Sequence, residues 1–244
     1  MGTYEVTGTA PLPITRAKAE QLYWLGRYSE RVYTTLGRLG KTYDANVDLE
    51  TADFSEFCRA LDLSFDTGLG LEELVASILY NADDPNSVCA SMRAAFGNAI
   101  ELRPELGTET VSYVELALIH LRASKDALSR LPRHRDVRDN LLAFWGSIED
   151  GMGSMEAKAM IFFGKYVERL ELWSRFGEPA ATLDRPLRKL IFYLGYVRHP
   201  ECLGIEGALS ALLANLTARG YGEELTGRLG DVLEIVRRRG GSAA

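Results

Sequence analysis

Two eleven-residue segments that lie far apart in the chain repeat one pattern. Residues 22–32 read Leu-Tyr-Trp-Leu-Gly-Arg-Tyr-Ser-Glu-Arg-Val, and residues 160–170 read Met-Ile-Phe-Phe-Gly-Lys-Tyr-Val-Glu-Arg-Leu. Four matched positions are identical and lie 138 residues apart: Gly26 and Gly164, Tyr28 and Tyr166, Glu30 and Glu168, and Arg31 and Arg169. A repeat of this kind predicts two related halves. Because related halves usually pack about an approximate two-fold axis, we expect the two segments to meet near the centre of the molecule.

Apolar residues recur at helical spacing along almost the whole chain, and no stretch longer than a few residues alternates like a half-buried strand. This pattern predicts an all-α protein, a single helical bundle of about nine or ten helices with an internal duplication. No long polar linker divides it. We therefore expect one domain over residues 14–239, with halves of about 14–131 and 133–239, and flexible tails at 1–13 and 240–244.

Capping and breaking residues predict where individual helices begin and end. Gly40 is expected to end the helix that carries the first motif, and a second helix is expected to start near Asp48. Arg103-Pro104 is expected to stop a later helix, because the residue before a proline disfavours helical geometry. Ser154 and Gly177 are expected to flank the helix that carries the second motif.

The composition excludes several classes of protein. The chain has 28 Lys and Arg against 34 Asp and Glu, a net charge of -6, which disfavours nucleic acid and anionic lipid as general partners. No apolar run is long enough to cross a membrane, and residues 1–13 do not have the pattern of a signal peptide. The three cysteines are widely spaced, which is typical of buried thiols in a reducing compartment. We therefore expect a cytoplasmic protein.

Each motif places three charged residues on one side of a helix, because residues three and four positions apart are neighbours there. Burying such charges is costly unless they pair. Crossed pairing of Glu30 with Arg169, and of Arg31 with Glu168, would satisfy both copies at once. On this interpretation the charges form a structural network that fixes how the two helices pack.

A second interpretation is that the charges line a binding or catalytic cavity. Its cationic residues would bind a carboxylate or phosphate, and Glu30 or Glu168 would act as an acid–base group. The candidate site has four cationic and two acidic residues, and this net positive charge favours a small anion as the ligand. Aromatic residues of the motifs are expected to be mainly core rings, although some could close such a site. The residues of this candidate site are Arg27, Tyr28, Glu30, Arg31, Lys165, Tyr166, Glu168 and Arg169, with Arg93 and Asn98 on a helix that could meet the motif helices.

The sequence contains no pattern for a metal or a cofactor. The three histidines are far apart and lack the spacing of helical di-iron or zinc protease sites. There is no Walker sequence and no dinucleotide-binding glycine pattern. We therefore expect no metal and no cofactor.

The segment from Thr15 to Arg31 resembles the opening motif of the alpha-E family, bacterial all-helical proteins named for a recurring Glu-Arg motif. Residues 163–169 resemble the family's second motif, and residues 85–88 with 93–99 resemble a third block. The resemblance covers roughly residues 14–216. The chain departs from the family at Lys165, where Arg is usual, and at Phe96-Gly97, where the third block usually has Arg-Glu.

The resemblance implies a setting rather than a reaction. Members of the alpha-E family resemble partners of circularly permuted ATP-grasp peptide ligases. The resemblance therefore implies an accessory component that positions substrate in an ATP-grasp-dependent system for peptide synthesis or modification. Its partner would be the ligase or the ligase's peptide. The alternative is an enzyme that acts on a peptide or amino-acid derivative in a central Glu/Arg-lined cavity.

Overall fold

The computed structural model describes residues 14–49, 54–63, 68–125, 134–197 and 205–241. The expected tail at 1–13 and the expected boundary between the halves at 131–133 lie outside these ranges. Within them the chain forms eleven helices and no strand, so the all-α prediction is confirmed. The helices are α1 (Arg16–Leu49), α2 (Phe54–Ala60), α3 (Leu71–Tyr80), α4 (Val88–Glu101), α5 (Arg103–Leu106), α6 (Thr108–Ala123), α7 (His134–Gly151), α8 (Met155–Arg175), α9 (Ala180–Leu194), α10 (Ile205–Ala218) and α11 (Glu223–Gly241).

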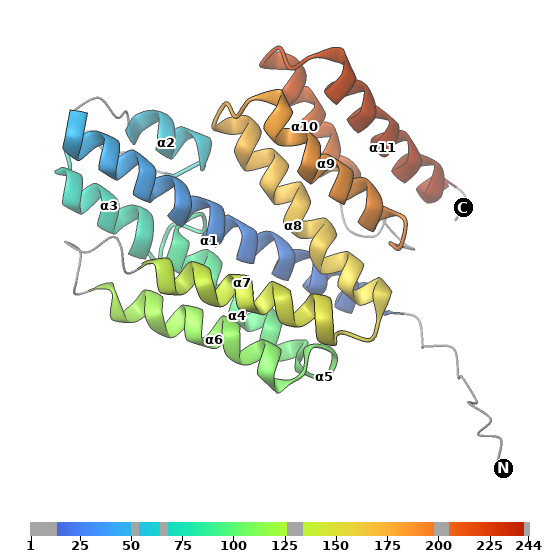
Figure 1. Ribbon diagram of the computed structural model, residues 1–244, viewed down its shortest axis with the longest axis horizontal. Coiled ribbons are helices and arrows are strands. Elements are labelled where there is room, and N and C mark those ends of the chain that lie inside the picture. Colours follow the sequence, from blue (N-terminus) through green and yellow to red (C-terminus); the bar gives the residue numbers. More distant parts are fainter. Residues whose placement is uncertain (1–13, 50–53, 64–67, 126–133, 198–204, 242–244) are drawn as a thin grey trace.

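The two motif helices, α1 and α8, lie against each other at the centre of the bundle, as the repeat predicted. On one side α1 packs against α4 and α7, and α6 covers those two helices (Figure 1). On the other side α8 packs against α9 and α10, and α11 packs on those. The contact between α1 and α8 therefore lies at the centre of the packed helices.

Two expectations about helix ends are corrected by the structure. Gly40 does not end α1, which continues to Leu49. A glycine inside a helix costs only about 1 kcal/mol, and the helical turns on either side compensate for this cost. The second helix begins at Phe54 rather than near Asp48. A one-turn helix, α5, follows α4 directly and brings the number above the nine or ten expected. Pro104 stops α4, but a proline fits the first turn of the next helix, where its missing N–H is not needed.

Ser154 and Gly177 flank α8, as the sequence predicted. Ser154 accepts a hydrogen bond from the backbone N–H of Ala157 at 3.2 Å and caps the start of α8. Gly177 follows the last turn of α8 with a positive φ of 70°, a conformation that favours glycine. The sequence around the second motif thus fixes both ends of its helix.

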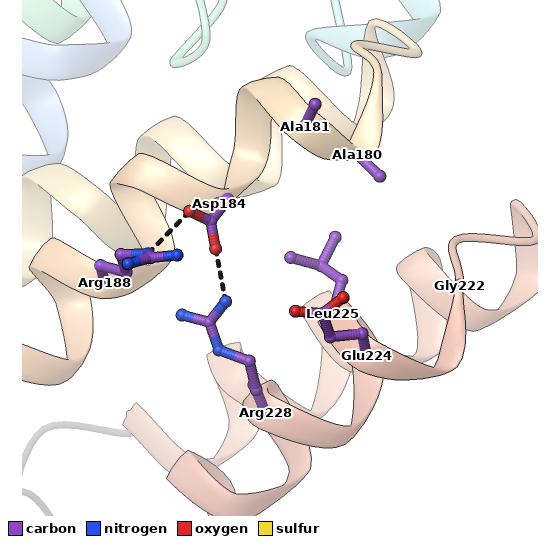
Figure 2. Close-up of a pocket in the computed structure, with 8 residues that line it drawn as sticks. All are labelled: Ala180, Ala181, Asp184, Arg188, Gly222, Glu224, Leu225 and Arg228. Atoms are coloured by element: carbon purple, nitrogen blue, oxygen red, sulfur yellow. Dashed lines mark hydrogen bonds and ion pairs between the residues drawn. The ribbon is translucent and has the colours of Figure 1, made fainter.

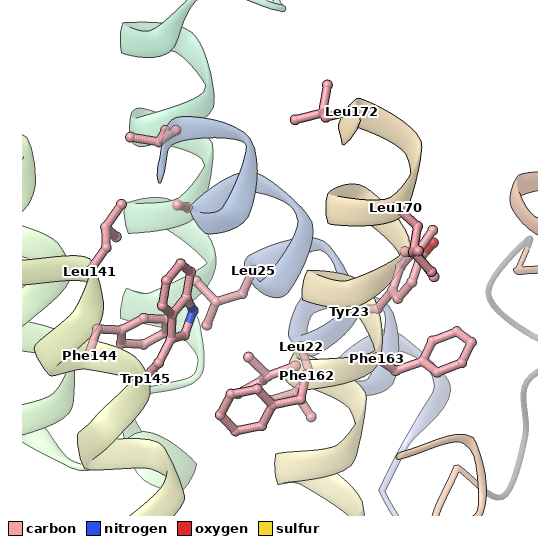
Figure 3. Packing of buried hydrophobic residues seen from close by; sticks show 14 of the residues in the cluster. Leu22, Tyr23, Leu25, Leu141, Phe144, Trp145, Phe162, Phe163, Leu170 and Leu172 are labelled. Atoms are coloured by element: carbon pink, nitrogen blue, oxygen red, sulfur yellow. The ribbon is translucent and has the colours of Figure 1, made fainter. Parts of the chain in front are cut away.

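The core extends from α7 through α1 to α8 (Figure 3). Leu22 and Leu25 of α1 are fully buried between Phe144 of α7 and Phe163 of α8. Burying a side chain of this size contributes roughly 1.5–3 kcal/mol. The core thus fixes the positions of α1 and α8, which carry the charged motif residues.

Gly26 and Gly164 let the backbones of α1 and α8 approach closely. A Cβ atom built on Gly26 would lie 1.9 Å from the carbonyl oxygen of Ile161, and one built on Gly164 would lie 2.1 Å from that of Tyr23. Each glycine thus lies against the residue three positions before the other glycine. The contact is reciprocal, as a local two-fold arrangement requires.

Candidate functional site: the Glu-Arg network between the motif helices

Crossed ion pairs join the two motif helices. Arg169 donates from Nε and Nη2 to the two carboxylate oxygens of Glu30, both at 2.7 Å. Arg31 donates from Nε to Oε1 of Glu168, also at 2.7 Å. The crossed pairing expected from the repeat is confirmed, and each helix supplies the acid for the other helix's base.

Both carboxylates are buried, with 0% exposure for Glu30 and 1% for Glu168. The side chains of Arg31 and Arg169 are 13% and 18% exposed. Removing a carboxylate from water costs several kcal/mol, and only well-formed pairs and hydrogen bonds offset this. The network is therefore stable only while each partner is present.

Every carboxylate oxygen of the two motif glutamates has a hydrogen-bond donor. Oε1 of Glu30 also accepts from the hydroxyl of Thr34 at 2.7 Å. Oε2 of Glu168 accepts from Nε of Arg27 at 2.6 Å. An acid–base group must reach a substrate proton, but these two carboxylates are buried and paired within the protein.

The network extends to residues that the sequence analysis did not place in the site. Arg31 donates to the side-chain oxygen of Asn86 at 2.9 Å, which ties the turn before α4 to α1. Glu171 accepts from Arg27 and from Arg175, each at 2.5 Å, and Arg175 also pairs with Asp62. Helical spacing could have identified two of these residues, Glu171 and Arg175, because they continue the face of α8 that carries Glu168.

Arg27 holds its charge firmly. Burial works against that charge, but the carboxylates of Glu168 and Glu171 more than offset it and raise the pKa of Arg27. The ring of Trp24 lies 5.2 Å from the guanidinium carbon and stacks on Tyr28, with the two ring centroids 5.3 Å apart. Burial likewise opposes the charge of Arg169, and its pairing with Glu30 raises its pKa.

Lys165 differs from Arg27, the residue at the equivalent position of the first motif. Its Nζ lies 3.3 Å from the ring centroid of Trp145 and 5.3 Å from that of Phe162, and no ion pair to Glu30 forms. The side chain is 7% exposed. Burial lowers the pKa of Lys165 to about 7, only partly opposed by the Glu30 carboxylate.

The aromatic residues of the motifs mostly lie in or against the core, as expected. Tyr23 and Phe162 are buried, and Tyr28 and Tyr166 are partly buried against the core. Trp24 is the exception, because 40% of it is exposed, so the prediction that it is a core ring is wrong. It lies on the outer side of α1, where it covers Arg27.

Two candidate residues lie away from the network. Arg93 is exposed on α4 and Asn98 is half-buried on the same helix. No hydrogen bond or ion pair in the described residues joins either side chain to the motif charges. The structure therefore brings together the motif residues of α1 and α8 but does not add these two to them.

Of three pockets on the described part of the molecule, none is lined by Glu30, Arg31, Lys165 or Arg169. One, of about 410 Å³, lies between α9 and α11 (Figure 2). There Asp184 pairs with Arg188 at 2.7 Å and with Arg228. Both arginines of this pocket are therefore paired with Asp184.

Thiol and metal chemistry have no site in the described residues. Cys58 and Cys89 are buried free thiols, and burial raises the pKa of Cys58 to about 11, well above the range of a reactive thiolate. Cys202 lies outside the described ranges. No group of three His, Cys, Asp or Glu in those ranges could hold a metal ion, and none of the described helices is long and apolar enough to cross a membrane.

Comparison with known proteins identifies the same motif. No curated protein and no solved structure is significantly similar to the chain. A family model does match, over residues 16–190, and it describes a predicted alpha-helical domain with a conserved ER motif, named Alpha-E. The matched range includes both Glu-Arg pairs of the network, Glu30-Arg31 and Glu168-Arg169. The chain therefore belongs to the Alpha-E family.

Proposed function

We propose that the chain is an accessory component of an ATP-grasp-dependent system for peptide synthesis or modification, which it serves by positioning substrate rather than by catalysis. One observation carries the non-catalytic part of this proposal. All four carboxylate oxygens of Glu30 and Glu168 are occupied by donors from the chain itself. Carboxylates that are buried and paired in this way fix the packing of two helices and are not exposed to a substrate.

The setting follows from family resemblance. The motif segments resemble those of Alpha-E proteins, and members of that family resemble partners of circularly permuted ATP-grasp ligases. A bundle whose two central glutamates are buried and paired within the chain suits a partner that holds a ligase or its peptide in place. The ligase would supply the nucleotide chemistry, and this chain would supply a surface.

A second candidate function is an enzyme that acts on a peptide or amino-acid derivative. Lys165 is the observation in its favour, because a buried lysine with a pKa of about 7 is a neutral amine in half of the molecules near neutral pH. A neutral amine can act as a nucleophile or a base. Against this, its Nζ lies on the ring of Trp145 and none of the three pockets reaches it.

Reconstitution with an ATP-grasp peptide ligase and its peptide separates the two functions. Products made with and without this chain are compared by mass spectrometry. We expect the same product mass and a higher yield when the chain is present. A product of different mass would instead make the chain an enzyme.

A matched pair of variants sharpens the result. Lys165→Met removes the amine but keeps a long apolar side chain, so an accessory chain should retain its effect on yield. Lys158→Met, on the same helix, is the control. If Lys165→Met alone abolishes a mass change, the catalytic alternative is correct; if no variant or wild-type chain alters yield or mass, the accessory role is wrong.

A further inference from the structure

A second pocket borders the network at the place where α1, α7 and α8 meet the start of α9. Its volume is about 340 Å³, at the low end of the range for small-molecule sites. Tyr33 of α1 and Trp173 of α8 form aromatic walls. Thr34, whose hydroxyl donates to Glu30, also lines it. The pocket therefore lies directly outside the Glu30–Arg169 pair without including it.

The lining of this pocket is cationic although the chain as a whole carries a charge of -6. Arg38, Lys41 and Arg138 face one acid, Glu178. Glu178 pairs with Arg38. Neither Lys41 nor Arg138 has an ion-pair partner in the described ranges, so two positive charges remain uncompensated beside the pocket.

Arg138 is held in place without being neutralised. Its guanidinium carbon lies 4.4 Å from the ring centroid of Tyr33. It also fits against Gly37, where an added Cβ would lie 3.2 Å from that carbon. Yet Nε of Arg138 is buried and has no hydrogen-bond partner in the described part of the chain. A buried donor left without an acceptor is unfavourable, and because Nε is itself buried, an anionic group in the pocket would pair with the charge of the guanidinium as a whole.

We propose that this pocket is a binding site for a small organic anion whose phosphate or carboxylate group lies between Arg138 and Lys41. The aromatic wall at Trp173 covers the organic part of the ligand. An arginine held flat on a ring presents its fork in one orientation, which suits a planar carboxylate or a phosphate. Glu178 keeps Arg38 occupied and limits the site to one anionic group. This site goes beyond the accessory role and does not depend on it.

Isothermal titration calorimetry at constant ionic strength tests the site with three probes: phenyl phosphate, benzoate and inorganic phosphate. We expect saturable binding of phenyl phosphate or benzoate to the wild-type chain, and weaker binding of inorganic phosphate. Preference for phenyl phosphate would assign the site to phosphate esters, and preference for benzoate would assign it to carboxylates. Equal affinity for phenyl phosphate and inorganic phosphate would overturn the role of the aromatic wall.

Variants locate the bound anion. Arg138→Gln should weaken binding by at least about tenfold. The control is Arg135→Gln on the same helix, where Arg135 is exposed and pairs with Asp139 at 3.5 Å; it should bind like the wild type. Lys41→Gln, at an exposed position of α1, provides a second test that does not depend on the folding of the Arg138 variant. No saturable binding by the wild type, or unchanged binding by both pocket variants, would overturn the proposal.

Discussion

Lys165 lies on the face of Trp145, with its Nζ 3.3 Å from the ring centroid, instead of against the Glu30 carboxylate. At the equivalent place in the first motif, Arg27 pairs with Glu168. The network is therefore asymmetric at this position. Both oxygens of Glu30 already accept hydrogen bonds from Arg169 and Thr34, so this carboxylate is paired without Lys165.

This arrangement predicts how stability depends on pH. The pKa of Lys165 falls from about 10.5 in the unfolded chain to about 7 in the folded one. Between these values the unfolded chain binds a proton that the folded chain does not, so the Lys165 contribution to stability rises as pH increases. Below pH 7 the buried ammonium destabilises the fold by an amount on the order of a few kcal/mol.

Lys165→Met should therefore stabilise the protein most below pH 7, and the gain should shrink as pH rises towards 10. Urea unfolding at several pH values measures this as the difference in unfolding free energy between variant and wild type. The charged groups around Lys165 are Glu30, Glu149, Arg169 and Lys189, and the difference removes their own titration to first order. A difference that does not change with pH would show that burial does not lower the pKa of Lys165.

The crossing of α1 and α8 should not tolerate a methyl group at either motif glycine. Gly26→Ala or Gly164→Ala places a Cβ within about 2 Å of a backbone carbonyl oxygen of the other helix, so the helices must move apart. Overpacking of this kind costs roughly 1–3 kcal/mol and often more when backbone must shift. Chemical denaturation gives the free energy of unfolding of each variant.

Gly40→Ala is the matched control, because Gly40 lies in the same helix and a Cβ there would meet nothing within 4 Å. It should stabilise the protein by about 0.5–1 kcal/mol, since alanine is the better helix former. The close crossing would be disproved if Gly26→Ala and Gly40→Ala changed stability alike.

Removing one motif carboxylate should be strongly destabilising. Glu30→Ala leaves the partly buried Arg169 without its carboxylate partner, and Glu168→Ala removes the partner of Arg31 and one of the two carboxylates that pair with Arg27. Breaking a buried pair costs about 3–5 kcal/mol. Thermal and urea unfolding should both show it, while Glu20→Ala, which breaks an exposed pair with Arg16, should change stability by less than about 1 kcal/mol. A loss below about 1 kcal/mol for Glu30→Ala would mean that the network contributes little.

The helices that carry the second motif and the third block each depend on a serine cap. Ser87 accepts from the backbone N–H of Ala90 at 3.1 Å, and Ser154 accepts from that of Ala157. Ser87→Ala and Ser154→Ala should each cost about 1 kcal/mol, since a backbone N–H loses its acceptor. Ser112→Ala, on the exposed side of α6, should stay within about 0.5 kcal/mol in the same measurement.

Much of the centre of this fold could be predicted from the repeat. Two matched segments with one glycine and one Glu-Arg pair each indicated a close helix crossing with exchanged ion pairs, and the structure has both. The common origin of the two halves remains a prediction. The length of α1 was missed at Gly40, because local breaking residues are outweighed where the flanking turns pack well.

The rest depended on contacts between helices that local patterns do not encode. Lys165 turns away from Glu30 because α7 brings Trp145 over it, and nothing in the second motif indicates that neighbour. Arg138 lies outside both motifs and gains its position from Tyr33 and Gly37 on another helix. Sequence spacing predicts neighbours within a helix, whereas these partners are set by how whole helices pack.

The crossed ion pairs between α1 and α8 resemble those of an isologous dimer interface, although both helices belong to one chain. Each motif helix offers the same glycine and the same Glu-Arg pair, so either one is close to complementary to itself. The two halves are not identical, because matched positions differ, for example Arg27 against Lys165 and Thr34 against Leu172. Differences of this kind favour one half meeting the other over one half meeting a copy of itself.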